Sequence, residues 1–179
     1  PDHVQGVGEI GSLTTMLVMD VSGSMNFAQK LESAKSAAQT YIGQMRSSDQ
    51  AGLLTFNTQI EYAQPITTNH QELSSAIDSL KAHDDTAMYD ALVNAIEILE
   101  SVPGRKAIIV LTDGLDNRST HTQDDVIQTI GPEGVSISSI GLGEPSHSRA
   151  ALSALDEPIL ISLAENAGGL YAYANDEAT

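Results

Sequence analysis

Three oxygen-bearing side chains, spaced two residues apart, follow a strongly apolar run near the start of the chain. Asp20, Ser22 and Ser24 come directly after the run from Leu13 to Met19, where we expect a buried strand to lead into a helix. One carboxylate and two hydroxyls are hard oxygen donors, which suit magnesium, calcium or manganese far better than zinc or copper. Three oxygens do not complete the octahedron of such an ion, so the motif predicts further donors elsewhere.

Two more donors lie at suitable places. Thr86 precedes a predicted helix, and Asp113 follows the apolar run from Ala107 to Leu111. In open parallel sheets, ligands bind beyond the carboxyl ends of the strands, at the point where strand order reverses. If the strands that end at Asp20 and Asp113 are neighbours there, three segments bring five oxygen side chains together. The two carboxylates would also offset the two positive charges of the ion.

Strand-like and helical patterns alternate along the chain. Apolar runs of strand length occupy 13–21, 51–56, 60–65, 107–112, 135–140 and 170–174. Apolar residues recur at helical spacing from Phe27 to Met45, from Leu73 to Leu80 after a cap at Asn69, from Met88 to Leu99, at 124–130 and at 158–166.

This alternation predicts one α/β domain over residues 1–179, with its core at about 12–175, in which helices cover both faces of a mostly parallel sheet. The short connection at Asn57 and Thr58 implies that the third strand is antiparallel and lies at an edge, where Pro65 is tolerated.

The oxygen donors resemble the metal-ion-dependent adhesion site of the von Willebrand factor type A domain, which uses Asp-x-Ser-x-Ser, then a Thr, then an Asp. The matching positions here are Asp20, Ser22, Ser24, Thr86 and Asp113. The resemblance continues in the family's order through 52–56, 91–92, 135–143 and 168–171, and so covers nearly the whole chain. It implies a Rossmann-like, doubly wound, six-stranded sheet with one antiparallel edge strand.

For function, the resemblance implies a binding module and not an enzyme. In the family the two serines contact a divalent ion directly, usually Mg²⁺, while the Thr and the second Asp exchange between direct and water-mediated contact. The first Asp often acts through water. A Glu or Asp of a protein partner typically fills the sixth position. Ca²⁺ or Mn²⁺ would also suit these donors.

One feature departs from the family pattern. Asp84 and Asp85 precede Thr86 where the family commonly has small residues, often Gly-Gly. If both carboxylates face the ion, they could tighten cation binding or favour calcium, and they could repel an acidic partner. If both point to solvent as part of a polar loop, the usual mechanism is undisturbed.

Composition restricts the partners. The chain has 24 acidic and 8 basic residues and a formal charge of −16. This balance argues against nucleic acid and anionic membranes as partners, because binding phosphates requires neutralising them. It favours cations or basic partners, although solubility alone would explain it. The chain has no cysteine, which excludes thiolate metal sites and cysteine nucleophiles.

The hydropathy of the chain and its first residues bear on where the protein is located. No apolar run approaches the roughly 18 residues that span a bilayer, so we expect no direct membrane insertion. The chain begins Pro1-Asp2-His3 without Met. We therefore expect a domain cut from a longer bacterial protein that is extracellular, periplasmic or membrane-anchored, with a cytoplasmic parent as the alternative.

Two other functions stay open. A magnesium-dependent phosphoryl-transferring hydrolase would use Asp20 as nucleophile, but such enzymes usually place a second acid where this chain has Ser22. We expect no lysine near the motif to hold a phosphate, because Lys30 is helical and Lys106 begins a strand. An interaction module without a bound ion is the other possibility. No Gly-x-Ser-x-Gly motif supports a serine hydrolase.

The remaining polar candidates are weaker. Five histidines lie on polar segments without ligand spacing, and we expect them at the surface: His3, His70, His83, His121 and His147. Asp116 and Asn117 could line the rim of the site, but an Asp-Asn pair in this context is typical of a turn.

Overall fold

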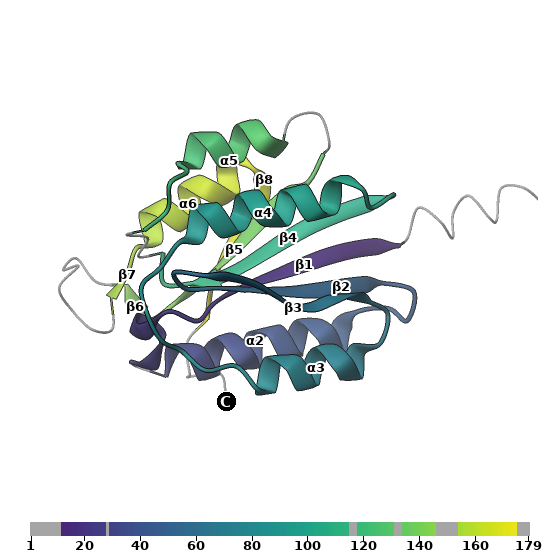
Figure 1. Cartoon of the computed structure of the whole chain (residues 1–179), viewed down its shortest axis with the longest axis horizontal. Helices are drawn as coiled ribbons and strands as arrows, with labels where there is room; N and C mark the ends of the chain where they lie inside the picture. Colours follow the sequence, from purple (N-terminus) through teal and green to yellow (C-terminus); the bar gives the residue numbers. More distant parts are fainter. Residues whose placement is uncertain (1–11, 28, 115–117, 131–133, 146–153, 175–179) are drawn as a thin grey trace, which may run out of the picture.

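A six-stranded sheet runs through the middle of the molecule (Figure 1). The computed structural model describes residues 12–27, 29–114, 118–130, 134–145 and 154–174. The strands of the sheet are β1 (Leu13–Asp20), β2 (Gln50–Phe56), β3 (Ile60–Thr67), β4 (Arg105–Thr112), β5 (Ser136–Leu142) and β8 (Gly168–Ala174). The helices are η1 (Gly23–Asn26), α2 (Lys30–Gln44), α3 (His70–Asp78), α4 (Met88–Glu100), α5 (Gln123–Ile130) and α6 (Glu157–Asn166). Two short strands, β6 (Glu144–Pro145) and β7 (Ala154–Leu155), pair with each other.

The strand order is β3-β2-β1-β4-β5-β8. Every neighbouring pair is parallel except β2 and β3, which are antiparallel at one edge. The predicted doubly wound, mostly parallel sheet with one antiparallel edge strand is therefore confirmed. From β1 the chain builds outward to β3 on one side, and then returns to place β4 on the other side of β1. The order of the strands thus reverses between β1 and β4, where a ligand site is expected.

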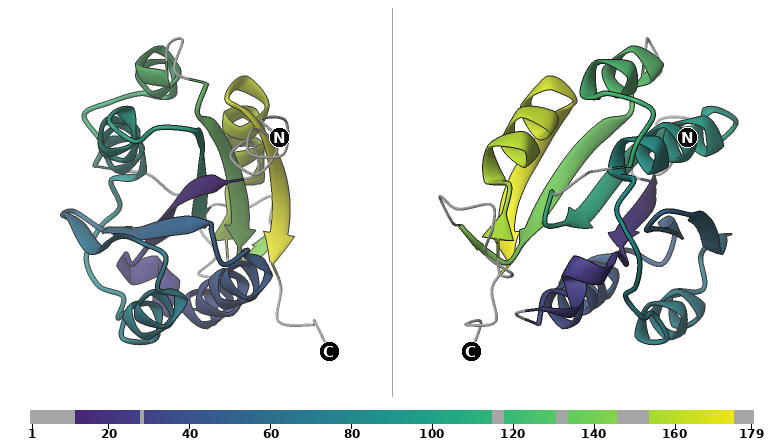
Figure 2. Two further views of the ribbon diagram at one scale, coloured as in Figure 1. Left: turned by 90° about the vertical axis from the view of Figure 1, so that its right-hand side faces the viewer. Right: turned by 60° about the vertical axis from the view of Figure 1, so that its left-hand side comes forward.

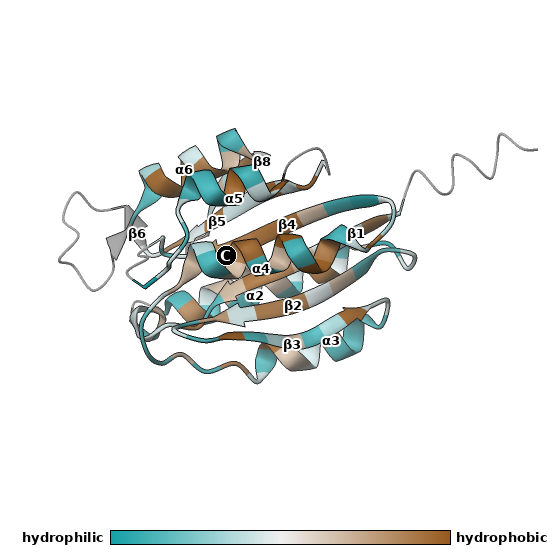
Figure 3. Ribbon diagram, turned by 45° about the horizontal axis from the view of Figure 1, so that its top comes forward, coloured by the Kyte–Doolittle hydropathy of each residue, from teal (hydrophilic) through white to brown (hydrophobic). Residues whose placement is uncertain are grey.

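Helices cover both faces of the sheet (Figure 2). The side chains of β1 divide between them in strict alternation, as strand geometry requires. Met16 and Val18 join the core under α4, α5 and α6, whereas Leu17 and Met19 join the core under α2 and α3. Burial on both faces favours apolar residues, which explains the continuous apolar run from Met16 to Met19, although Thr14, Thr15 and Asp20 of the same strand are buried as well. Figure 3 shows hydrophobic colour along much of the central strands.

The start of α2 differs from the prediction. The helical stripe was expected to begin at Phe27, but that side chain is 43% exposed and lies before the helix. Gln29 adopts a left-handed conformation with φ of 53°, and α2 begins at the next residue, Lys30. Lys30 shares a helix face with Ala34 and Ala38, and both it and Leu31 are buried in the first turn.

The predicted cap of α3 is confirmed. The side chain of Asn69 accepts hydrogen bonds from the backbone N–H groups of Gln71 and Glu72. None of the helices in the described part of the chain combines the length and the apolar character needed to cross a bilayer.

The junction of β5 and β8 contains a close backbone approach that only glycine allows. A Cβ at Gly169 would overlap the backbone of Ile137 and Ser138. We predict that Gly169→Ala lowers the free energy of unfolding by about 1–3 kcal/mol, because the strands must separate to admit the methyl group.

Gly43 supplies the matched control, since a Cβ there meets nothing within 4 Å and the residue lies in α2. Gly43→Ala should leave stability unchanged or raise it by up to about 1 kcal/mol through helix propensity. Thermal denaturation of the two variants tests this. Equal melting temperatures would show that the β5–β8 junction adjusts freely.

Candidate metal centre

The register of β1 and β4 brings the first two candidate segments together. Met19 pairs with Leu111, so Asp20 and Thr112 are the next residues at the same edge of the sheet. The hydroxyl of Thr112 donates to Asp20 Oδ2 at 2.7 Å, and it accepts a bond from the N–H of Gly114 at 3.0 Å. Asp113 follows directly. The two loops are thus fixed to each other by the side chain of Thr112, a role that its position at a strand end does not reveal in the sequence.

The two serines direct their protons to the two carboxylates. Ser22 donates to Asp20 Oδ1 through its N–H at 2.8 Å and through its Oγ at 2.5 Å. Ser24 Oγ donates to Asp113 Oδ2 at 2.6 Å. A carboxylate only accepts, and a hydroxyl has only one proton to give. The two Oγ atoms lie 3.2 Å apart, within hydrogen-bond distance of each other, so the two hydroxyls face each other between the two carboxylates.

This spacing matches a cation site. Two adjacent ligands of an octahedral ion with bonds of about 2.1 Å lie about 3.0 Å from each other. The serine oxygens are at nearly that separation, with carboxylates on either side. No group of three or more His, Asp or Glu side chains arranged for a metal is found in the described ranges. The candidate centre is therefore one of hydroxyls and two carboxylates.

Both carboxylates of the centre are buried, and burial disfavours their charged forms. The side chains of Asp20 and Asp113 are both 0% exposed. Loss of hydration, together with repulsion from Asp113, raises the pKa of Asp20 to about 7, although hydrogen bonds from Ser22 and Thr112 act in the opposite direction. Without a cation, ionising both carboxylates in this buried place therefore costs free energy.

Thr86 is buried beside these loops. Its segment is hydrogen-bonded to the loop after β1, since the N–H of His83 donates to Val21 O and the N–H of Gly23 donates to Asp84 O. It is also bonded to the loop after β4, because Arg118 N donates to Thr86 O at 3.0 Å. All three predicted segments therefore meet at this edge of the sheet.

The two aspartates before Thr86 have solvent-facing partners. The side chain of Asp84 is 58% exposed and bonds His83 Nδ1 at 2.8 Å. The side chain of Asp85 is 43% exposed and accepts from Arg118 Nε at 2.7 Å. Of the two arrangements considered, the structure has the one in which both point to solvent.

Lys30 is the largest departure from the sequence-based expectation. Its Nζ lies 3.1 Å from Asp113 Oδ2, and both side chains are 0% exposed. From the sequence we expected no lysine placed to hold a phosphate, and we did not foresee a lysine buried against Asp113. A lysine at the start of a helix normally reaches solvent. The only sequence signal was its position four residues before Ala34 on the buried face.

Other polar contacts support the loops. Asp90 of α4 accepts from the backbone N–H groups of Thr120 and His121, which fixes the segment before α5. These bonds outweigh the desolvation that opposes them and lower the pKa of Asp90. His83 and His121 are exposed and His70 is partly buried. His3, His147, Asp116 and Asn117 lie outside the described residues.

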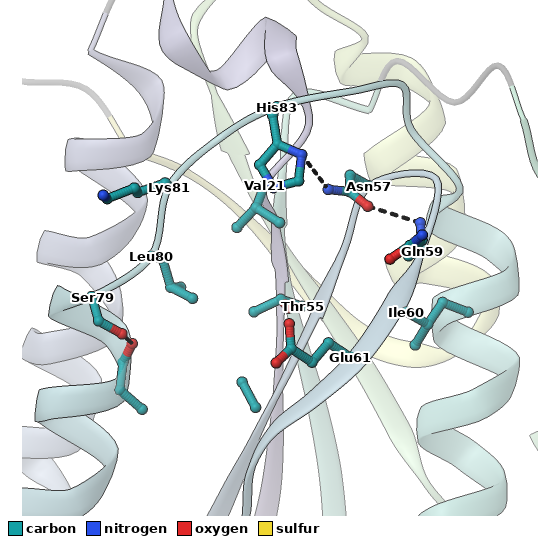
Figure 4. Close-up of a pocket in the computed structure, with 12 residues that line it drawn as sticks. Val21, Thr55, Asn57, Gln59, Ile60, Glu61, Ser79, Leu80, Lys81 and His83 are labelled. Atoms are coloured by element: carbon teal, nitrogen blue, oxygen red, sulfur yellow. Dashed lines mark hydrogen bonds between the residues drawn. The ribbon is translucent and has the colours of Figure 1, made fainter.

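A hollow of about 520 Å³ opens beside the centre, between the β2–β3 turn and the segment after α3 (Figure 4). Glu61 and Lys81 contribute opposite charges to its lining. Asn57 stands at its end, where its side chain meets His83 Nδ1 at 3.2 Å and its carbonyl accepts from Ala87 N. Asn57 therefore holds the segment that carries Thr86.

Comparison with known proteins agrees with this fold. The family model for the von Willebrand factor type A domain matches residues 15–115, more than half of the 179-residue chain. An uncharacterized protein of Borreliella burgdorferi is 27% identical over 184 residues, covering 90% of this chain and 54% of its own length. The chain thus spans about half the length of that curated relative.

Two solved structures illustrate the likeness. An aerotolerance-related membrane protein from Bacteroides fragilis, with multiple mutations to serines, superposes with a TM-score of 0.77 at 22% identity, over 92% of both chains. Proximal thread matrix protein 1 from the mussel byssus, with a zinc-occupied metal-ion-dependent adhesion site, gives a TM-score of 0.74 at 21% identity. That match covers 94% of this chain and 43% of the mussel protein.

The raised pKa of Asp20 predicts how the metal-free protein responds to pH. Because the folded-state pKa of about 7 exceeds the unfolded value of about 4, this group's contribution to stability is complete below pH 4 and is lost as the pH rises through 7. In the presence of a chelator, the melting temperature of Asp20→Asn relative to that of the wild type should therefore rise by several degrees as the pH is raised from 5 to 8.

Asp84→Asn is the control, because it removes the same charge at an exposed position nearby. Its melting temperature should stay parallel to that of the wild type. Parallel curves for Asp20→Asn as well would mean that Asp20 ionises without penalty.

Proposed function

We propose that this chain, which belongs to the von Willebrand factor type A family, is a divalent-cation-dependent module that binds an acidic residue of a protein partner. Its ligands would be Asp20, Ser22, Ser24, Thr86 and Asp113. The observation that carries the proposal is the approach of Ser22 Oγ and Ser24 Oγ to 3.2 Å while each donates to a different buried carboxylate. We propose Mg²⁺ as the ion, with Ca²⁺ or Mn²⁺ as alternatives.

The residues have distinct roles in this proposal. Ser22 and Ser24 offer neutral oxygens whose protons are already committed, so coordination does not require a proton to leave. Asp20 and Asp113 supply negative charge from beneath, where burial strengthens their effect. When bound, the cation offers an exchangeable coordination position that a carboxylate oxygen can fill. The zinc-occupied site named for the mussel protein supports the choice of a metal-binding module.

An enzyme is the less favoured function. Lys30 does lie at the site, but its side chain is wholly buried and pairs with Asp113, so it does not face a substrate phosphate. Ser22 stands where a phosphoryl-transfer enzyme would place its second acid. Members of the family are generally interaction modules. Turnover of a phosphate ester with Mg²⁺, abolished by Asp20→Asn, would favour the hydrolase instead.

The relatives support a proposal about the setting of the domain. Since the chain covers 54% of the Borreliella protein, further segments of the parent protein are expected. The Bacteroides fragilis neighbour is described as a membrane protein. We therefore propose a membrane-anchored or secreted parent that presents this domain to protein partners.

Cation titration tests the ligand set directly. We predict saturable Mg²⁺ binding by calorimetry, with Asp20→Ala and Asp113→Ala each weakening it at least about tenfold because each removes a formal charge. Ser22→Ala should cost less, since it removes a neutral donor. In saturating Mg²⁺ the wild type should also bind a glutamate-rich peptide, and chelator should abolish that binding.

The double variant Asp84→Asn, Asp85→Asn is the matched control, because both carboxylates are exposed and paired away from the centre. It should bind Mg²⁺ within about twofold of the wild type. Unchanged affinity in Asp20→Ala would place the cation elsewhere, and binding of the peptide without metal would refute the proposed mode of capture.

The fold should not depend on the cation. Both faces of the sheet carry a continuous hydrophobic core, unlike small domains that fold only with metal. Chelator should lower the melting temperature only by the binding linkage and leave the far-ultraviolet circular dichroism unchanged at 25 °C. Loss of the helical signal on chelation would contradict this.

A further inference from the structure

Lys30 forms a fully buried ion pair at the floor of the candidate metal centre. Its Nζ lies 3.1 Å from Asp113 Oδ2, the same oxygen that accepts the proton of Ser24. Both side chains of the pair are 0% exposed. The left-handed conformation of Gln29 turns the chain so that α2 begins at Lys30, with its side chain directed inward.

This placement is unusual within the chain. Only 8 of its 179 residues are basic, against 24 acidic ones. Among the described residues, Lys30 is the only buried lysine or arginine. A buried ion pair gives little net stability, because removing two charges from water costs about as much as their attraction returns. The position of Lys30 therefore calls for an explanation other than general stability.

We propose that Lys30 is a built-in counter-ion that tunes the charge of the metal centre. This inference rests on the proposed cation-binding function. With both carboxylates ionised, Asp20, Asp113 and Lys30 sum to −1, whereas the two aspartates alone would sum to −2. With a divalent cation the sum is +1, and without the lysine it would be 0.

Two consequences follow from this charge. Lys30 lowers the repulsion between the two buried carboxylates in the metal-free protein, so the ligands stay assembled. It also makes the loaded centre positive, which weakens the hold on the cation and strengthens attraction for an anionic sixth ligand. Lys30 would thus lower the affinity of the centre for the cation and raise the affinity of the loaded centre for an acidic partner.

Lys30→Met tests the proposal, because methionine keeps the length of the side chain and removes its charge. The probe is Mn²⁺ alone, followed by electron paramagnetic resonance, and then acetate titrated into the Mn²⁺-loaded protein, followed by water proton relaxation. We expect Mn²⁺ binding roughly tenfold or more tighter and acetate binding several-fold weaker. Lys35→Met is the control, since Lys35 lies on the same helix but pairs with the exposed Glu32. It should change neither affinity.

A second measurement, of melting temperatures, tests the proposal if Lys30→Met folds poorly. In chelator, Lys30→Met should lower the melting temperature, and adding Asp113→Asn to it should restore part of the loss by removing the unpaired charge. Saturating Mn²⁺ should raise the melting temperature of Lys30→Met more than that of the wild type.

The outcomes separate this inference from the proposed function. No Mn²⁺ binding by the wild type would overturn the proposed function. Wild-type binding with unchanged or weaker Mn²⁺ affinity in folded Lys30→Met would overturn only the role of Lys30. Acetate affinity equal to that of the wild type would refute the bias toward anionic ligands.

Discussion

The structure around the candidate centre is governed by the repulsion between two carboxylates that share one buried place. Asp20 and Asp113 end adjacent parallel strands, and neither is exposed. Burial removes the water that would screen them, so each charge raises the cost of the other. The surrounding groups all reduce this cost. Three hydroxyl groups and one ammonium donate to the two carboxylates, from Ser22, Ser24, Thr112 and Lys30.

The sheet is what forces the two carboxylates together. Parallel neighbours end at the same edge, and the reversal of strand order between β1 and β4 leaves that edge free of a crossing connection. The two-sided core then fixes the strands firmly enough for the loops to keep their geometry. Backbone bonds from the segment that carries Thr86 to both loops complete the arrangement. The rigid sheet and its loops therefore hold the carboxylates of Asp20 and Asp113 together although the two repel each other.

The sequence predicted the fold well because its main signal is periodic burial. The apolar run from Met16 to Met19 in β1, the cap at Asn69 and the short turn at Asn57 each have one simple structural meaning, and the structure has all three. The oxygen donors were predicted to converge because strand ends converge. Thr112 was overlooked as a contact of the site since a threonine at a strand end is ordinary.

Phe27 was assigned to the wrong environment, and the burial of Lys30 was not foreseen. Hydropathy places phenylalanine inside and lysine outside, but at the start of α2 the lysine is buried against the carboxylate of Asp113, and the phenylalanine before it is 43% exposed. The orientation of Asp84 and Asp85 was likewise left open by the sequence. It depends on His83 and on Arg118, which lies 33 residues beyond Asp85 and meets it only in the folded chain.

The mixture of ligand types has a consequence for what the centre can bind. A site made of carboxylates alone would neutralise or exceed the charge of a divalent cation, and an acidic partner would then be repelled. Hydroxyls coordinate without adding charge, so Ser22, Ser24 and Thr86 would fill positions around the ion while leaving its charge available. Asp84 and Asp85 bond His83 and Arg118 and stay outside the centre. Among the described residues, two carboxylates and one ammonium lie at the centre, so a centre loaded with a divalent cation, as we propose, would be suited to accept a carboxylate from outside.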